Sequence, residues 1–354
     1  MRNFYLGKTL RLIVLGAIMP TGICFAGNPD RAGQAGATEL LINPWARSGG
    51  WGGANSGAVH GLEAQFWNVA GTAHTKKTEA IFSHTNYLQG SGMTLSAFGL
   101  TQKAGEGSVL GLSIMSFDFG DIPITTTDLP EPSLGNYSPQ YINIGLSYAK
   151  VFSNSIYGGI NFKIVSENIS NVSAQGMALD AGIQYVTGTN EDRDNVKFGI
   201  ALKNVGTPLK FGGDGLSTRA TLPSGTYQLT IEQRAAGFEM PSLLNIGASY
   251  DFKAAADHRI TLAGSFTSNS FTKDQFTAGL EYAFKEMFMV RGGFTYEEDI
   301  FDDNLRTSVY TGPSAGVTLE VPMGKSGKKF GIDYSYRATN PFDGIHSFGG
   351  KFTL

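Results

Sequence analysis

The stretch that decides the fold reads Phe276-Thr277-Ala278-Gly279-Leu280-Glu281-Tyr282-Ala283-Phe284. Apolar side chains occupy every second position, and small or polar side chains fill the positions between them. Successive side chains of a β-strand point to opposite faces, so this alternation predicts a strand with one apolar and one polar face. The same alternation returns in the ranges 244–252 and 330–337. It predicts an all-β chain.

The composition narrows the class of β protein. The chain has 354 residues, including 47 glycines, with 12% aromatic and 16% charged residues. A transmembrane barrel needs aromatic side chains on its lipid face and small or polar side chains on its inner face. No run of about 18 apolar residues follows the N-terminus, which excludes a helical membrane protein. The net charge of -3 is too weak to imply a nucleic-acid partner. A secreted, soluble β protein remains the alternative class.

The first 26 residues read as a secretory signal peptide. They have a basic start, an apolar run over 12–18 and Ala26 before the expected cleavage point. Cys24 is the only cysteine, and Ile23 stands before it where a lipoprotein signal has a small residue. We therefore expect an exported mature chain that begins at Gly27 and carries no thiol.

Alternation bounded by turn residues predicts an antiparallel barrel of about 14 transmembrane strands over residues 78–354. The expected strands are Thr78–Tyr87, Met93–Gln102, Ser108–Asp118, Tyr141–Phe152, Ser155–Glu167, Gly176–Thr187, Asn195–Asn204, Leu243–Lys253, His258–Asn269, Asp274–Phe284, Met287–Glu297, Pro313–Pro322, Gly327–Arg337 and His346–Leu354.

The connections between these strands alternate in length. Those after even-numbered strands are short, as in 103–107, 153–154, 254–257 and 285–286, whereas long ones follow odd-numbered strands, as in 119–140, 205–242, 298–312 and 338–345. Bacterial outer-membrane barrels have short periplasmic turns and long outer loops. The pattern thus predicts an outer-membrane location with both termini in the periplasm.

Residues 27–77 do not alternate, and we expect them to form a glycine-rich, partly helical plug. They contain Ala46-Arg47-Ser48-Gly49-Gly50-Trp51-Gly52-Gly53-Ala54, followed by Glu63-Ala64-Gln65-Phe66-Trp67-Asn68-Val69-Ala70-Gly71. The second string predicts a short helix that ends at Asn68.

In these two strings the chain resembles the PorV/PorQ family of FadL-like outer-membrane barrels. The residues that carry the resemblance are Arg47, Gly50, Gly52, Gly53, Ala54, Asn68 and Gly71. The resemblance implies a 14-stranded barrel of the Bacteroidota type IX secretion system. Its partners would be the translocon barrel and the C-terminal signal domains of secreted cargo.

Two long loops are the candidate partner-binding surfaces, because long loops on a rigid scaffold commonly serve binding. The range 119–140 is proline-rich, and in the range 205–242 three apolar residues alternate, which favours a protruding hairpin or an edge for strand addition. A lid over the barrel mouth is the alternative. The candidate residues are Ile122, Pro123, Leu129, Pro130, Tyr227, Leu229, Ile231 and Phe238.

The sequence offers no motif for catalysis or for a cofactor. Five histidines, at 60, 74, 84, 258 and 346, have no metal-ligand spacing. The acidic run 297–303 lacks the glycine and spacing of a calcium loop. Gly105-Glu106-Gly107 lies in a predicted turn with no helix after it, unlike a nucleotide loop. We therefore predict a non-enzymatic protein without cofactor or metal.

Three hypotheses of function follow. The first is a type IX secretion barrel that binds or shuttles cargo and docks on the translocon through its outer loops. The second is a FadL-like transporter of hydrophobic small molecules, in which 28–73 forms the plug. The third is a passive barrel that stabilises a larger assembly.

Overall fold

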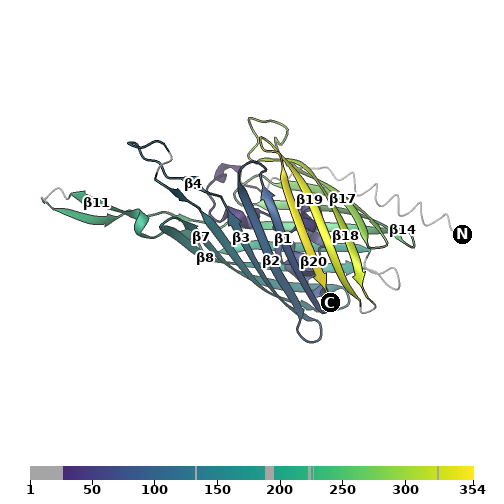
Figure 1. Cartoon of the computed structure of the whole chain (residues 1–354). Helices are drawn as coiled ribbons and strands as arrows, with labels where there is room; N and C mark the ends of the chain where they lie inside the picture. Colours follow the sequence, from purple (N-terminus) through teal and green to yellow (C-terminus); the bar gives the residue numbers. More distant parts are fainter. Residues whose placement is uncertain (1–26, 132–133, 188–194, 222–224, 226, 325–326) are drawn as a thin grey trace.

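A closed antiparallel barrel of 14 strands forms the body of the molecule (Figure 1). The structure is a computed structural model that describes residues 27–131, 134–187, 195–221, 225, 227–324 and 327–354. The expected signal peptide and Cys24 lie outside the described residues. Each strand pairs with its neighbours along the chain, and β1 closes the barrel against the last strand, β20.

The fold class predicted from the alternation is confirmed. The barrel strands are β1 Thr78–Tyr87, β2 Met93–Lys103, β3 Ser108–Asp118, β6 Gln140–Val151, β7 Ile156–Ile169, β8 Val172–Thr187, β9 Val196–Gly206, β14 Leu243–Ala255, β15 His258–Asn269, β16 Gln275–Phe284, β17 Phe288–Glu297, β18 Tyr310–Met323, β19 Lys328–Thr339 and β20 Ile345–Thr353.

The predicted strand ends were wrong at one hairpin. We expected β7 to end at Glu167 and β8 to begin at Gly176, but pairing continues to Ile169 opposite Val172. Polar residues, among them Asn168, Ser170 and Asn171, interrupt the intervening stretch, so the alternation of apolar residues stops before the hydrogen-bonded ladder does. This part of the ladder extends the barrel wall beyond its apolar band.

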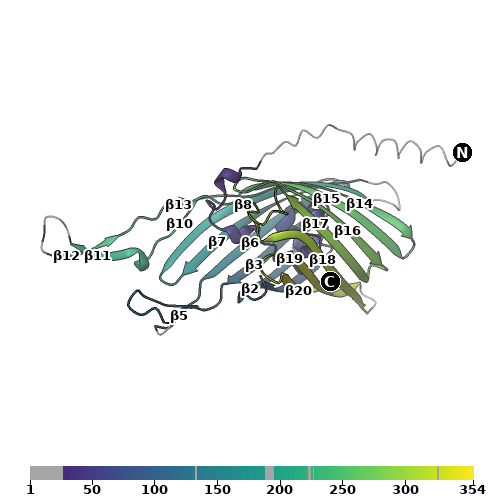
Figure 2. The ribbon, with the colours of Figure 1, turned by 90° about the horizontal axis from the view of Figure 1, so that it is seen from above.

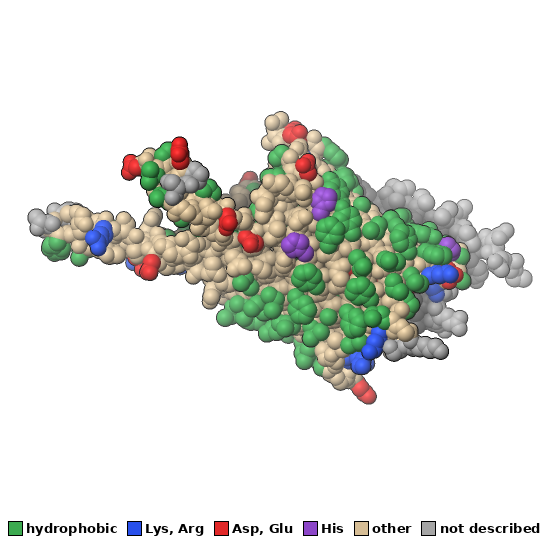
Figure 3. All heavy atoms as spheres, in the orientation of Figure 1, with side chains coloured by type: hydrophobic (Ala, Val, Ile, Leu, Met, Phe, Trp, Pro, Cys, Tyr) green, Lys and Arg blue, Asp and Glu red, His purple; other side chains and the backbone are tan. Residues whose placement is uncertain are grey.

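The two faces of the wall have opposite chemistry. On the outside Phe276, Leu280 and Ile332 are 45%, 48% and 55% exposed. On the inside Glu281 and Arg291 are 6% and 2% exposed. Figure 3 shows apolar side chains gathered over the wall and charged side chains toward its two ends. Apolar outside and charged inside is the distribution of a transmembrane barrel.

The longest connections lie at one end of the barrel, which we call the long-loop end. They carry three small two-stranded sheets, which project from that end (Figure 2). These are β4 Ile122–Pro123 with β5 Asn136–Tyr137, β10 Leu209–Lys210 with β13 Gly237–Phe238, and β11 Ser217–Thr221 with β12 Gln228–Glu232. The opposite rim, where β1 begins and β20 ends, is the short-turn end.

The segment before β1 lies within the barrel (Figure 1). We call residues 37–75 the plug, because they contact the inner faces of strands from all around the wall. The helices are η1 Pro29–Arg31, η2 Thr38–Leu41, α2 Ala46–Gly49, η3 Ala54–Gly57, η4 Gly61–Glu63, α3 Ala64–Trp67, η5 Val69–His74 and η7 Asp214–Leu216.

The predicted short helix ending at Asn68 is confirmed as α3, which Asn68 caps. None of the helices in the described residues has the length and apolarity to cross a membrane.

Candidate functional site

The glycines of the predicted motif let the plug backbone touch the wall. A Cβ added at Gly50 would lie 2.8 Å from the Cα of Gly316 on β18. Gly53 has a φ of 103°, a conformation that favours glycine. A Cβ at Gly71 would lie 2.0 Å from the carbonyl oxygen of Val59. Gly50 therefore lets the plug backbone reach the wall, whereas Gly53 and Gly71 serve close packing within the plug.

Three further motif residues fix the plug against other strands. The Asn68 side chain donates to the Ile183 carbonyl at 3.1 Å and accepts from the Ala70 amide at 3.2 Å. Ala54 is 0% exposed and packs with Trp51 and Ala263. Gly52 lies beside Thr295, whose hydroxyl donates to the Gly52 carbonyl at 3.3 Å. All seven motif residues lie in the plug, and none lies at the molecular surface.

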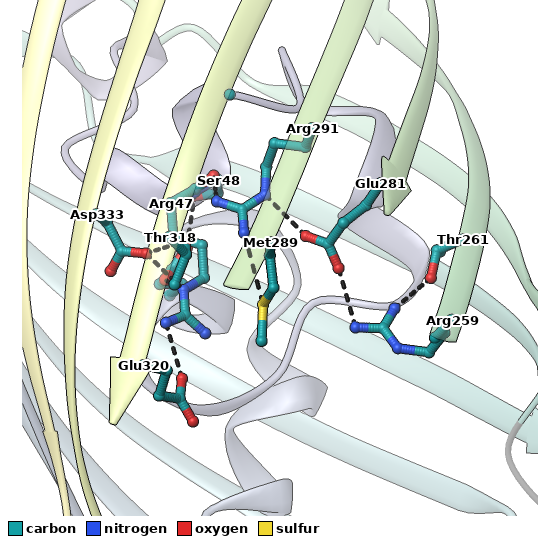
Figure 4. A network of polar contacts seen from close by, with 12 residues as sticks. Arg47, Ser48, Arg259, Thr261, Glu281, Met289, Arg291, Thr318, Glu320 and Asp333 are labelled. Carbon is teal, nitrogen blue, oxygen red and sulfur yellow. Dashed lines mark hydrogen bonds and ion pairs between the residues drawn. The ribbon is translucent and has the colours of Figure 1, made fainter. Parts of the chain in front are cut away.

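Arg47 is the charged anchor of the plug (Figure 4). Its Nε lies 2.9 Å from Asp333 Oδ1, and its Nη2 lies 2.9 Å from Glu320 Oε2. Glu63, also in the plug, is 3.9 Å away. Burial alone would lower the pKa of Arg47, but Asp333, Glu63 and Glu320 together raise it, so the guanidinium stays charged.

A second arginine supports the first. Arg291 on β17 is 2% exposed, and its Nε lies 2.8 Å from Glu281 Oε2. Its Nη1 donates to the Arg47 carbonyl at 3.3 Å. Arg259 on β15 pairs with the other Glu281 oxygen at 3.0 Å. The result is a charge network that joins α2 of the plug to the strands β15–β19 (Figure 4).

Glu39 in η2 is a buried acid at the other side of the plug. Burial, and then the nearby Glu167 carboxylate, raise its pKa from 4.5 to about 7. With the Asn143 amide nitrogen turned toward it, Glu39 Oε1 accepts a hydrogen bond of 3.2 Å. Glu167 in turn accepts from the Ala37 amide at 2.9 Å. Proton uptake at Glu39 therefore favours the docked plug.

The structure brings together two histidines whose spacing in the sequence did not indicate a shared site. The His60 and His74 rings lie 4.4 Å apart, and His74 stacks on Tyr157 of β7 at 4.1 Å. Burial, and then His74, hold the pKa of His60 well below its ordinary value. Within the described residues, no group of three or more His, Cys, Asp or Glu side chains could hold a metal ion.

The candidate loop residues lie on two separate projections of the long-loop end (Figures 1 and 2). We call the β11–β12 hairpin, residues 217–232, the arm. Its Leu229 and Ile231 are 42% and 44% exposed, and Tyr227 beside its tip is 63% exposed. The predicted protruding hairpin is thus present. Phe238, at 39% exposure, pairs with Leu209 at the base of the arm.

The other loop forms its own small sheet. Ile122 pairs with Tyr137 and Pro123 with Asn136, and Leu129 near the tip is 49% exposed. Pro130 is exposed beside Leu129. The structure therefore does not gather the eight candidate residues into one surface.

A cavity in the lumen is the feature that the sequence did not reveal. It has a volume of about 190 Å³ and lies at the long-loop end, between the plug and strands β9 and β14–β19. Phe66 and Trp67 of the plug line it, together with Lys203 and Arg337 of the wall. A smaller cavity of about 50 Å³ lies between Trp45 and strands β3, β6 and β7. The alternation predicted that the inner face carries charged residues, but it could not predict which of them line one cavity.

Comparison with known proteins supports the fold, through similar solved structures, but finds no similar sequence. No family model matches the chain, and no curated protein sequence matches it. The toluene transporter TbuX of Ralstonia pickettii is 11% identical, with a TM-score of 0.51 over 88% of this chain and 98% of that one. The toluene transporter TodX of Pseudomonas putida is 10% identical, with a TM-score of 0.52 over 88% and 96%. At such identities the likeness shows that the fold is that of bacterial outer-membrane channels.

Proposed function

We propose that this chain is a non-enzymatic outer-membrane transporter of small molecules with a hydrophobic body. The observation that carries the proposal is the cavity of about 190 Å³ inside the barrel, where the plug ends below the long loops. An apolar cavity of about 150 Å³ is large enough to hold benzene, so the space suits a molecule with one ring. Phe66, Trp67 and Tyr310 supply its aromatic lining.

The fold supports the same function. The two solved structures TbuX and TodX are named toluene transporters, and both align over most of this chain. In this chain the plug fills the lumen below the cavity, so passage requires the plug to shift. The plug is held by polar contacts such as those of Arg47 and Asn68 and by apolar packing of Trp45 and Leu62 against the wall, so a shift must break both kinds of contact.

Uptake of radiolabelled toluene by cells that express the protein tests this function. We expect an initial rate several-fold above that of cells carrying an empty vector. Thr277→Trp fills the cavity from β16 and should bring uptake to background, whereas Ala278→Trp, the next residue, faces lipid and should leave it unchanged. Uptake no faster than the vector control, from barrels shown to be folded, contradicts the proposal.

A second function, cargo handling in type IX secretion, is supported by a different observation. The arm stands away from the barrel and exposes Tyr227, Leu229 and Ile231 on a hairpin whose pairs are all internal to it. Exposed apolar side chains on such a projection suit a protein partner. With the resemblance of the plug motif, this makes the translocon barrel and the C-terminal signal domains of cargo the partners that we propose for the arm.

Capture of partners from solubilised outer membranes tests the second function. Changing Tyr227, Leu229 and Ile231 together to serine should abolish co-purification of a translocon or of C-terminal signal domains. A matched variant that changes Gln228, Thr230 and Glu232 to alanine on the same hairpin should retain it. Recovery of the lone barrel from the wild type counts against this function and leaves the transport proposal standing.

A further inference from the structure

The cavity at the long-loop end contains two cations without carboxylate partners. Lys203 on β9 is 3% exposed, and its ammonium lies 3.9 Å from the centre of the Phe66 ring. Arg337 on β19 lies 3.6 Å over the Tyr310 ring. Neither forms an ion pair with any residue that the structure describes. Both side chains line the same cavity.

The other charged side chains of the lumen are arranged differently. Their cations each lie within 4.0 Å of a carboxylate. These paired cations are Arg47, Lys163, Lys197, Arg259, Arg291 and Lys351. The two lumen cations that lack a carboxylate partner therefore both line this one cavity.

The acids nearest to this cavity are already engaged. Asp180 acts electrostatically on Lys203, but its carboxylate is held by Lys163 Nζ at 2.6 Å and by the Asn204 amide at 2.8 Å. Glu297, which lines the cavity, accepts from Thr307 at 2.9 Å and from Gln275 at 2.9 Å. With Lys203 protonated, the lining carries two cations and one carboxylate, an excess of one positive charge.

The hydrogen-bond donors of the cavity show the same imbalance. The Trp67 Nε1 and Arg337 Nε atoms are buried donors without a partner in the described residues. The hydroxyls of Ser265, Thr277 and Thr307 already donate hydrogen bonds to acceptors of the protein. A site with free donors and excess positive charge needs a ligand that supplies acceptors and negative charge.

From this imbalance we infer that the cavity binds a small organic carboxylate, with its anionic group attracted by the lining cations Lys203 and Arg337 and its body against Trp67. The volume of about 190 Å³ limits the ligand to about one ring with its carboxylate. The inference rests on the proposed transport function for its biological meaning, since it names the class of molecule transported. Binding itself is measurable without transport.

Titration of the purified barrel in detergent with benzoate tests the site, with toluene as the uncharged molecule of similar shape. Trp67 lies in the cavity, so its fluorescence reports binding beside calorimetry. Lys203→Met keeps the stacking on Phe66 without the charge and should weaken benzoate binding about 10-fold, as should Arg337→Met. Lys203→Arg should bind benzoate as the wild type does. The ratio of benzoate affinity to toluene affinity should fall in both methionine variants.

The controls separate this site from folding and from transport. Heat-modifiable mobility on gels and far-ultraviolet circular dichroism must match the wild type in each variant. Benzoate binding that is unchanged in Lys203→Met and in Arg337→Met overturns the site, as does inorganic sulfate binding as tightly as benzoate. Toluene uptake without benzoate binding defeats this inference alone, whereas charge-dependent benzoate binding without toluene uptake by cells defeats only the transport of neutral hydrocarbons.

Discussion

Replacing Arg47 with methionine should release the plug while the barrel stays folded. Arg47 holds Asp333 and Glu320 at 2.9 Å each, and the Asp333 side chain is only 3% exposed. Breaking a buried ion pair by removing one partner costs about 3–5 kcal/mol, because the other charge stays buried. Thr318 still donates to Asp333, and Lys329 still lies 2.9 Å from Glu320. We therefore expect the lower end of that range, about 3 kcal/mol.

The chain provides a selective probe for this experiment. Its three tryptophans, Trp45, Trp51 and Trp67, all lie in the plug, whereas the strands dominate the far-ultraviolet circular dichroism signal. In a urea titration of the barrel in lipid vesicles, Arg47→Met should move the fluorescence transition to lower urea and leave the dichroism transition in place.

A double variant checks the cause of that loss. Adding Asp333→Asn to Arg47→Met removes the uncompensated charge and should recover about 1 kcal/mol or more. The reasoning is refuted if Arg47→Met shifts the fluorescence transition by less than about 0.5 kcal/mol, the range of an ordinary surface substitution. It is equally refuted if both transitions shift together.

Three further predictions concern packing, pH and orientation. A Cβ at Gly247 would lie 2.5 Å from the Gly57 nitrogen, so Gly247→Ala should destabilise plug docking by about 1–3 kcal/mol, whereas Gly264→Ala, with its nearest atom at 3.6 Å, should be neutral by the same titration. Because the docked plug raises the pKa of Glu39 to about 7, its docking should weaken as pH rises from 4.5 to about 7, by up to about 3 kcal/mol. Fluorescence titrations across this pH range should show a shallower slope for Glu39→Gln than for the wild type; an equal slope in both proteins contradicts the assignment. Trypsin added to intact cells should cut at the exposed Arg219 of the arm if the long-loop end faces outward, whereas cleavage only after lysis reverses the orientation.

The wall of this protein could be predicted because adjacent residues of a strand face opposite sides, one toward lipid and the other toward the lumen. Ala278 and Thr277 differ in chemistry because one faces lipid and the other the lumen, and that difference is legible without any partner strand. The hairpin of β7 and β8 was missed for the same reason. There the buried face carries Glu167 and Ala174, a charged and a small residue, so the ladder continues without an apolar alternation that would predict it.

The site could be predicted only in part. The glycines of the plug signalled close packing, and the alternation of Leu229 and Ile231 signalled the arm. The cavity is lined by Lys203 and Arg337, which are far apart in sequence and come to the same cavity only through barrel closure and the position where the plug ends. Nothing local to either residue distinguishes it from a paired lumen cation such as Lys197.

The two unpaired cations also bear on what the plug is for. A plug that only seals the lumen needs no charge at residue 203, since methionine there would pack on Phe66 without the cost of desolvating an ammonium. Lys203 is nevertheless 3% exposed and unpaired among the described residues, so its charge is solvated only through the cavity that it lines. An anion that enters the cavity replaces this limited solvation and at the same time contacts Trp67 in α3 of the plug. Ligand binding and plug position are therefore coupled through α3, and the ligand that fits the site acts on the element that must move for it to pass.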